Sequence, residues 1–281
     1  LFLSFEVRFL AKIIGVFIAT SYTFASLISF KYFFDFKKCP VFFNFILKII
    51  FPIFNFLYYN FMNASKKNVA LQAIDLLKTK LYPEMILGIG TGSTVNAFID
   101  NIDQIANYFS AAVSSSNAST SLLRDKGINV LDLNDVNEIH FYIDGADEVD
   151  PNNFLIKGGG GAHTKEKIIA SASNEFICLV DESKRVSELG SFPLPIEVLP
   201  MSRSLVSRTI VSMGGVPIYR NGFITDHQNH IIDVTGLDFS DPSNLEKKLN
   251  AIPGVVDNGC LLYTSDAADD TPCVDLGGRR I

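Results

Sequence analysis

The segment Met85-Ile-Leu-Gly-Ile-Gly-Thr-Gly-Ser-Thr94 sets the architecture of this 281-residue chain. Its first residues, Met85 to Ile89, form a short apolar run that is typical of a buried strand. An apolar-periodic stretch from Val95 to Ile102 follows and predicts a helix. The glycines between the two allow a tight turn in which the backbone can approach a ligand closely.

Strand and helix patterns alternate on both sides of this segment. The stretch before it, Val69–Leu77, has helical spacing. Beyond it, further strands are expected at Ala111–Val113, Ile128–Leu131, His140–Ile143 and Phe176–Val180, and further helices at Ser114–Lys126 and Lys165–Ala172. Such alternation predicts an α/β fold, with a Rossmann-like parallel sheet covered by helices on both faces, over residues 62–195.

The pattern changes after Pro193-Leu-Pro-Ile-Glu-Val-Leu-Pro200. A helix is expected at Ser202–Met213, a hairpin from Phe223–Thr225 and His230–Val234 around the turn Asp226–Asn229, and a second helix at Leu245–Asn250. These elements predict a small second domain of α+β, ferredoxin-like type at residues 196–256.

Both ends of the chain differ in composition from the rest. Residues 1–61 hold 16 of the 24 Phe and no Met, and six Lys or Arg against two acids. Three interpretations are open: a conceptual translation of an untranslated region of the transcript, a cleaved targeting leader, or a membrane anchor. Hydropathy alone would flag Phe9–Phe30 and Cys39–Phe61 as membrane spans. We interpret residues 257–281 as a truncated return segment followed by a non-native tail from Cys260 on, the alternative being a disordered acidic tail.

Charge and cysteine usage exclude some classes of protein. The net charge of −6 and the pI near 5.2 argue against general nucleic-acid binding, which needs a basic face. None of the four cysteines has the spacing of a metal site. A reduced, intracellular protein fits this pattern.

Two polar segments follow predicted strands and open predicted helices. Gly88-Ile-Gly-Thr-Gly-Ser-Thr94 offers N–H groups and hydroxyls to a phosphate or a polyol oxygen, but it is neither a dinucleotide fingerprint nor a P-loop. Ser114-Ser-Ser-Asn-Ala-Ser-Thr120 is similar in kind. A plain tight turn remains open for the first segment, and simple helix capping for the second.

Two further segments carry ionisable groups. Asp144-Gly-Ala-Asp-Glu-Val-Asp150 follows an apolar strand, where open α/β sheets bind ligands, and its carboxylates suit sugar hydroxyls and proton transfer. Lys157-Gly-Gly-Gly-Gly-Ala-His-Thr-Lys-Glu166 combines a lysine and a carboxylate around four glycines, which suits a base with an oxyanion stabiliser. The alternatives are an acidic loop or a cation site for the first segment, and a flexible linker for the second.

These four segments, in this order, resemble the ribose-5-phosphate isomerase A family. So do Asp181-Glu-Ser-Lys184, the proline-rich segment 193–200 and Ile252-Pro-Gly-Val-Val-Asp-Asn-Gly259. The resemblance covers nearly everything from about Lys66 to Gly259. Gly161 and His163 depart from it, since the family's usual pattern has Ala and an apolar residue there.

The resemblance implies a metal-free enzyme without cofactors that interconverts ribose 5-phosphate and ribulose 5-phosphate in the pentose phosphate pathway. It implies three catalytic residues, with Glu166 as the proton acceptor, Lys157 as the oxyanion stabiliser and Asp144 in ring opening. The substrate-binding residues it implies are Thr91, Gly92, Ser93, Thr94, Gly145, Ala146, Asp147, Gly158, Gly159, Gly160 and Lys184.

The resemblance also implies a homo-oligomer, a dimer or tetramer. Its partner would be a phosphorylated pentose, with no nucleic acid and no membrane for the mature enzyme. We expect a cytoplasmic location, or a plastid or other organelle if residues 1–61 are a genuine leader. Two alternatives remain: a non-catalytic sugar-phosphate-sensing domain, and a sugar-phosphate deaminase or lactonase on the same fold.

Overall fold

The structure is a computed structural model that describes residues 51–262 and 273–274, with side chains from Asn63 to Leu262. The chain divides into two compact units at Phe61 and Met62. The predicted apolar span Phe9–Phe30 and most of residues 1–61 lie outside the described residues. Within the described part of the chain, no helix is both long and apolar enough to cross a membrane.

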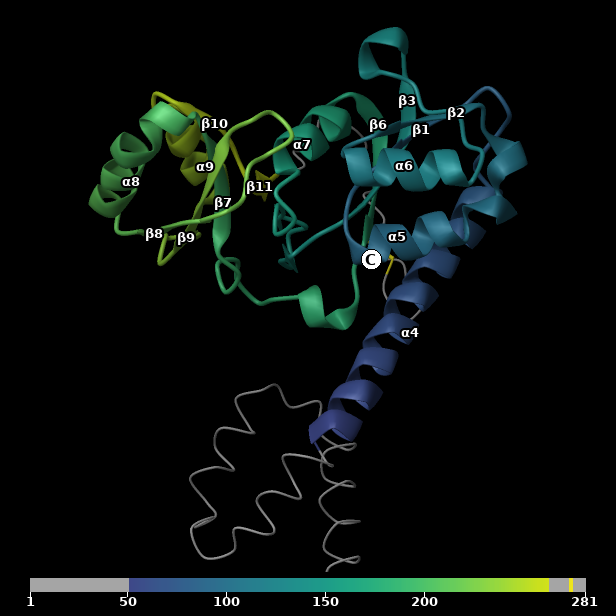
Figure 1. The fold of residues 1–281 in the computed structure, drawn as a ribbon, viewed down its shortest axis with the longest axis horizontal. Coiled ribbons are helices and arrows are strands. Elements are labelled where there is room, and N and C mark those ends of the chain that lie inside the picture. Colours follow the sequence, from purple (N-terminus) through teal and green to yellow (C-terminus); the bar gives the residue numbers. More distant parts are fainter. Residues whose placement is uncertain (1–50, 263–272, 275–281) are drawn as a thin grey trace, which may run out of the picture. The chain divides into compact units, whose positions relative to one another are not determined.

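A parallel sheet forms the first layer of the unit that begins at Met62 (Figure 1). Its strands lie in the order β12-β6-β3-β1-β2, and each neighbouring pair is parallel. Their bounds are Ile86–Ile89 for β1, Ala111–Ser114 for β2, Ile139–Gly145 for β3, Ser173–Leu179 for β6 and Cys273–Val274 for β12. The predicted α/β class with a parallel sheet is confirmed.

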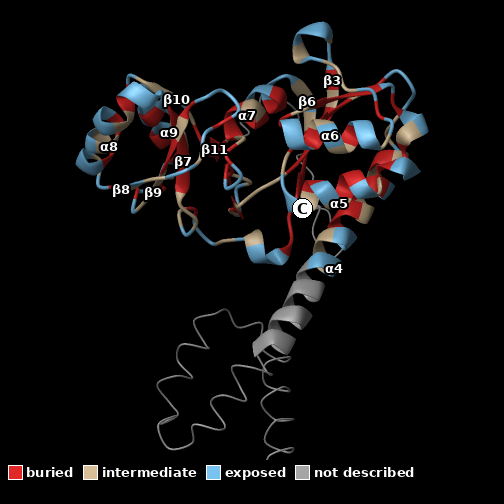
Figure 2. Ribbon diagram, viewed as in Figure 1, coloured by how far each residue is buried: buried red, intermediate tan, exposed pale blue. Residues whose placement is uncertain are grey.

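Helices cover both faces of this sheet. They are α4 (Phe51–Lys78), α5 (Ser93–Asp100), α6 (Asn117–Asp125) and α7 (His163–Ser171). Alternate residues of a strand point to opposite faces, so Phe141 and Ile143 pack in one core with α4 and α5. Tyr142, between them, packs in a second core with Ile169 of α7. Figure 2 shows the strands buried between these helices.

The strand order places a topological switch point between β1 and β3. From β1 the chain crosses through α5 to β2 on one side, and then returns through α6 to β3 on the other side. Open α/β sheets bind ligands at the carboxyl ends of strands at such a point. Here those ends lead into the segments that begin at Gly90 and at Asp144.

Two smaller antiparallel sheets complete this unit. One has the order β10-β7-β9-β8, and α8 and α9 lie beside it (Figure 1). Its strands are β7 (Leu194–Val198), β8 (Val216–Tyr219), β9 (His230–Thr235) and β10 (Val255–Asn258), with α8 at Arg203–Ser212 and α9 at Pro242–Asn250. The other has the order β11-β5-β4, formed by Glu148–Val149 (β4), Leu155–Ile156 (β5) and Cys260–Leu261 (β11). The 3-10 helices span Ile102–Gln104, Ala106–Tyr108, Leu133–Asp135, Glu182–Lys184 and Pro200–Ser202.

Two predicted strands are wrong. Ile128–Leu131 makes only a single bridge to β2, between Val130 and Ala112, because the chain turns into a 3-10 helix at Leu133. The predicted hairpin strand Phe223–Thr225 is part of a loop, and β9 pairs with β7 and β8 instead. Gly222, at φ 74°, helps to turn the chain out of the ladder after β8.

The segment after Gly259 is partly built into the fold. We expected a non-native tail from Cys260 on, yet Cys260 and Leu261 are buried in β11 and pair with β5. Gly259 itself packs tightly, since a Cβ there would lie 2.2 Å from the carbonyl oxygen of Lys157. The chain around Gly259 therefore helps to position Lys157.

Candidate active site

The glycine turn and the acidic segment meet at the switch point. Gly90 lies so close to Asp144 that a Cβ on it would be 1.9 Å from the carboxyl carbon, so a side chain is excluded there. The Asp144 Oδ1 atom accepts from the backbone N–H of Thr91 at 3.1 Å and of Gly145 at 2.7 Å. Two of the predicted motifs therefore form one site.

Lys157 brings the polyglycine segment to the same carboxylate. Its Nζ lies 2.7 Å from Asp144 Oδ2 and 3.2 Å from Glu166 Oε2, and it donates to the carbonyl oxygen of Gly145. All three ionisable side chains are buried. Lys157 follows β5, and Glu166 lies in the first turn of α7. The three predicted catalytic residues thus form one cluster.

The ionisation of this cluster follows from its burial. Burial raises the pKa of Glu166 to about 8, and the Asp144 carboxylate adds to the rise while Lys157 opposes it. Burial disfavours the charge of Lys157, but Asp144 and Glu166 outweigh burial and raise its pKa above the ordinary value. Glu166 Oε2 is buried, and its polar partner is the Lys157 ammonium at 3.2 Å. The site therefore holds a strongly basic carboxylate beside an ammonium group.

The polyglycine loop is folded tightly between these groups. Gly158 has φ 100°, and a Cβ there would lie 2.7 Å from His163 Nδ1. The N–H of Gly159 donates to Asp147 Oδ2 at 2.7 Å, which joins another predicted binding residue to the loop. Gly160 is exposed, with open space around its Cα. Positive φ values and close approaches explain why side chains are excluded at Gly158 and Gly159.

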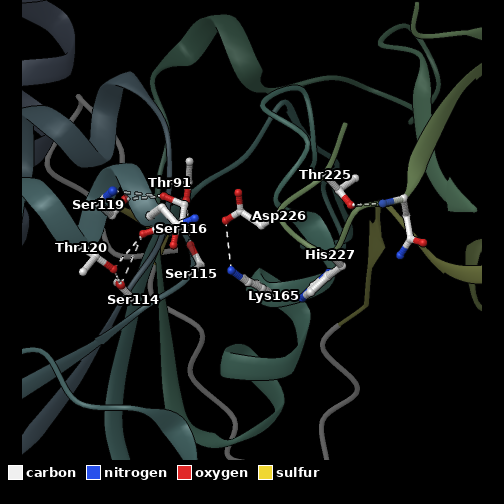
Figure 3. Close-up of polar contacts among 12 residues, drawn as sticks. Thr91, Ser114, Ser115, Ser116, Ser119, Thr120, Lys165, Thr225, Asp226 and His227 are labelled. Carbon is white, nitrogen blue, oxygen red and sulfur yellow. Dashed lines mark hydrogen bonds and ion pairs between the residues drawn. The ribbon is translucent and has the colours of Figure 1, made fainter. Parts of the chain in front are cut away.

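The serine-rich segment supports the glycine turn. Ser116 caps α6 by accepting from the N–H of Ser119, and Ser119 Oγ donates to the carbonyl oxygen of Gly90 at 2.6 Å. The hydroxyls of Thr91 and Ser115 lie 2.8 Å apart (Figure 3). The segment thus contains a helix cap, the alternative left open by the sequence, and also holds Gly90 in place.

The remaining predicted binding residues lie around this cluster. Gly92, at φ 118°, is the N-cap of α5 and supplies no side-chain cap, while Ser93 is exposed and Thr94 half-buried in the first turn. Ala146 is half-buried against the second core. Lys184 ends the 3-10 helix that follows β6, and no hydrogen bond or ion pair among the described residues joins it to this cluster.

Tyr142 was missed by the sequence analysis. Its hydroxyl donates to Asp144 Oδ2 at 2.5 Å and also hydrogen-bonds Ser115. Burial and the neighbouring carboxylates raise its pKa well above the ordinary value, so it stays a neutral donor. Its position two residues before Asp144 on a strand places both on one face, a signal that the sequence did contain. Asp144 consequently accepts from four donors.

Comparison with known proteins identifies the family. The family model for ribose 5-phosphate isomerase A (phosphoriboisomerase A) matches residues 111–269. A ribose-5-phosphate isomerase A of Legionella pneumophila (strain Lens) is 56% identical over 176 residues, which cover 63% of this chain and 82% of the relative. This chain belongs to the ribose 5-phosphate isomerase A family.

Solved members of the ribose 5-phosphate isomerase A family share the fold. The crystal structure from Neisseria gonorrhoeae is 44% identical, with a TM-score of 0.70, and covers 77% of this chain and 94% of its own. A D-ribose-5-phosphate isomerase solved in complex with phospho-erythronic acid is 36% identical, with a TM-score of 0.69, over 76% of this chain and 96% of its own. The resemblance stated from the sequence is confirmed. Among the described residues, no group of His, Cys, Asp and Glu is arranged to hold a metal ion.

Proposed function

We propose that this chain interconverts ribose 5-phosphate and ribulose 5-phosphate, as an aldose–ketose isomerase of the non-oxidative pentose phosphate pathway. Membership of the family supports the activity. The observation that carries the chemistry is the buried Glu166 carboxylate, with one oxygen 3.2 Å from the Lys157 ammonium. A base beside a fixed positive charge is what proton abstraction next to a carbonyl requires.

Glu166 is the proposed proton carrier between adjacent carbons. Its carboxylate removes the proton from C2 of the open-chain aldose, and the electrons of that C–H bond move onto the carbonyl oxygen O1. A proton passes from O2 to O1, and Glu166 returns its proton to C1, so the product carries a carbonyl at C2. A pKa of about 8 makes Glu166 a stronger base than an ordinary glutamate.

Lys157 is the proposed stabiliser of the ene-diolate oxygens. Its ammonium is buried and is fixed by Asp144 and the carbonyl oxygen of Gly145, so it needs little reorganisation when negative charge develops. Asp144 accepts from four donors, which makes it the anchor of Lys157. A role for Asp144 in ring opening requires a sugar oxygen to replace one of these donors.

The substrate is proposed to lie across the carboxyl ends of β1 and β3. The first turn of α5, with Ser93 and Thr94, offers N–H groups that no side chain caps, which suits a phosphate. Asp147 and the loop from Gly158 to Gly160 would hold sugar hydroxyls, and Lys184 would add a positive charge. We propose that phospho-erythronic acid, which binds a solved relative, also binds here, with its carboxylate in the place of the ene-diolate.

We also propose that the mature enzyme works without metal, in the cytoplasm, as a homodimer or homotetramer. Exposed apolar side chains beside the antiparallel sheet, including Met201 at 93% exposure and Ile218 at 61%, support self-association. Light scattering coupled to size exclusion would measure the mass. A monomer at all concentrations would contradict the oligomeric state.

A coupled assay for ribulose 5-phosphate formed from ribose 5-phosphate, with and without a chelator, tests the function. We expect turnover in both conditions, with kcat/KM rising as the pH rises through about 8, because Glu166 must be deprotonated. Binding of ribose 5-phosphate without turnover would instead support a sensor. Turnover of an amino sugar phosphate or a sugar lactone alone would support the deaminase or lactonase.

A further inference from the structure

A side chain from the antiparallel sheet contacts the polyglycine loop directly. Arg220, just after β8, donates through Nη1 to the carbonyl oxygens of Gly158 at 3.3 Å and Gly159 at 3.1 Å. Its Nη2 lies 3.4 Å from the same Gly158 oxygen. No residue of the predicted site comes from this sheet, so Arg220 is an addition to the site.

Arg220 is itself held in a fixed geometry. Its Nε donates to Asp233 Oδ2 at 2.8 Å, and its Nη2 donates to Asp233 Oδ1 at 2.5 Å. The guanidinium carbon lies 5.4 Å from the ring centroid of Phe223. Phe223 also packs on the loop, because a Cβ on Gly161 would lie 2.3 Å from its ring. A bidentate ion pair of this kind restricts the arginine side chain far more than a single hydrogen bond does.

The contacts with Arg220 decide where the loop N–H groups point. In a trans peptide the carbonyl oxygen and the following N–H point in opposite directions. Fixing the oxygens of Gly158 and Gly159 therefore directs the N–H groups of Gly159 and Gly160 away from Arg220. The Gly159 N–H donates to Asp147 Oδ2. The Gly160 N–H has no hydrogen-bond partner among the described residues.

We propose that Arg220, held by Asp233, is a positioning residue that fixes the loop so that the N–H group of Gly160 is directed toward the anionic reaction intermediate. The proposal rests on the proposed isomerase function and deepens it, since it makes the antiparallel sheet part of the active site. Four consecutive glycines have many accessible conformations, so an external contact is needed to select one. Oriented N–H groups help most where charge develops in the transition state.

The matched pair Arg220→Met and Lys165→Met tests the proposal. Lys165 joins α7 to the β8–β9 loop through Asp226 at 3.0 Å (Figure 3), but it makes no contact with the loop carbonyl oxygens. We expect Arg220→Met to lower kcat by about 10- to 100-fold with KM within about threefold, since oriented donors act in the transition state. Lys165→Met should keep kcat within about twofold, as is usual for an exposed ion pair.

Inhibition by phospho-erythronic acid supplies the readout that a purely structural role would not change. An ene-diolate mimic should lose affinity in Arg220→Met by about the same factor as kcat, while KM for ribose 5-phosphate changes little. Asp233→Asn keeps Arg220 but weakens the ion pair that holds it, so it should give a smaller loss of kcat and inhibitor affinity. This variant keeps the proposal testable if Arg220→Met does not fold.

Unchanged kcat and inhibitor affinity in both Arg220→Met and Asp233→Asn would overturn the proposal. An equal fall of kcat in Lys165→Met would also overturn it. So would a rise in KM for ribose 5-phosphate in Arg220→Met by the same factor as its loss of inhibitor affinity. The proposed function is judged separately from the unsubstituted protein, because absence of its turnover refutes the isomerase whatever the variants show.

Discussion

Two buried glutamates in this protein have opposite chemistry. Glu166 lies in α7, and burial raises its pKa to about 8, with the Lys157 ammonium beside one of its oxygens. Glu197 lies in β7, and although burial acts in the same direction, hydrogen bonds from Thr164, Asn229 and Thr225 lower its pKa below the ordinary value. Thr164 is in α7 as well, so one short helix carries Glu166 and donates a hydrogen bond to Glu197.

The difference shows that donors, rather than burial, decide what a buried carboxylate does. Glu197 accepts from Thr225 Oγ1 at 2.7 Å and Asn229 Nδ2 at 2.9 Å, as well as from Thr164 (Figure 3 shows Thr225). Such a carboxylate is a stable anion that joins the antiparallel sheet to α7. Glu166 has no such set of hydroxyl and amide donors, and its raised pKa lets it take up a proton.

Removal of the Glu166 carboxylate should have the largest effect. Glu166→Gln keeps the shape of the side chain but cannot accept a proton from carbon, so kcat should fall by about 10²–10⁴-fold with substrate binding largely kept. Steady-state kinetics and calorimetric titration with ribose 5-phosphate would measure both. Near-normal kcat would show that Glu166 is not the base.

The matching change at Glu197 should act on stability instead. Glu197→Gln leaves buried donors poorly satisfied, which costs about 1–3 kcal/mol of unfolding free energy. We expect kcat/KM within about tenfold of the unsubstituted protein. Urea unfolding would measure the loss, with Glu175→Gln as the control, because Glu175 pairs with Lys80 at a more exposed site. A large fall of kcat in Glu197→Gln without a loss of unfolding free energy would contradict the purely structural role of Glu197.

The stability should depend on pH through Glu166. Its folded-state pKa of about 8 lies above the ordinary 4.5, so between these values the folded protein keeps a proton that the unfolded chain has released. This contribution is fully present below pH 4.5 and is lost as the pH rises through about 8. The advantage of Glu166→Gln in unfolding free energy should therefore grow by on the order of 1 kcal/mol per pH unit between pH 6 and 8. An advantage that is constant with pH would contradict the raised pKa.

His163 should give the smallest effect, with the opposite dependence on pH. Burial lowers its pKa to about 4, against the opposing charges of Glu197 and Asp257 and a hydrogen bond to the Asp257 backbone. The stability of a buried neutral histidine is present above pH 6.5 and is lost as the pH falls toward 4. His163→Leu should stabilise the protein by on the order of 1–2 kcal/mol at pH 5 and by less at pH 7.5.

Urea unfolding at the two pH values would measure this change. His227→Leu is the control, since its ring is about a third exposed and no comparable gain at pH 5 is expected. An equal gain for both variants, or none for His163→Leu, would contradict the burial of a neutral ring. Activity should be unaffected at pH 7.5, because His163 contacts the loop without carrying a proposed chemical role.

Much of the fold could be predicted because it depends on local patterns. The apolar runs of β1, β3 and β6 alternate with helical periods, and this alternation is sufficient for a parallel sheet. The failures came where tertiary pairing overrides local pattern. Phe223–Thr225 has the pattern of a strand but lies in a loop, because β8 takes the position beside β9 that this segment was expected to occupy.

The sequence by itself determined the parallel-sheet class, the glycine turns and the residue types of the site, because these depend on periodicity and on spacing along the chain. Only the tertiary structure decided that Tyr142 and Lys157 share one oxygen of Asp144, that Glu166 is basic and Glu197 is not, and that Arg220 holds the glycine loop. Burial and hydrogen-bond partners come from residues distant in sequence, and a pKa or a loop conformation depends on those partners more than on the residue itself.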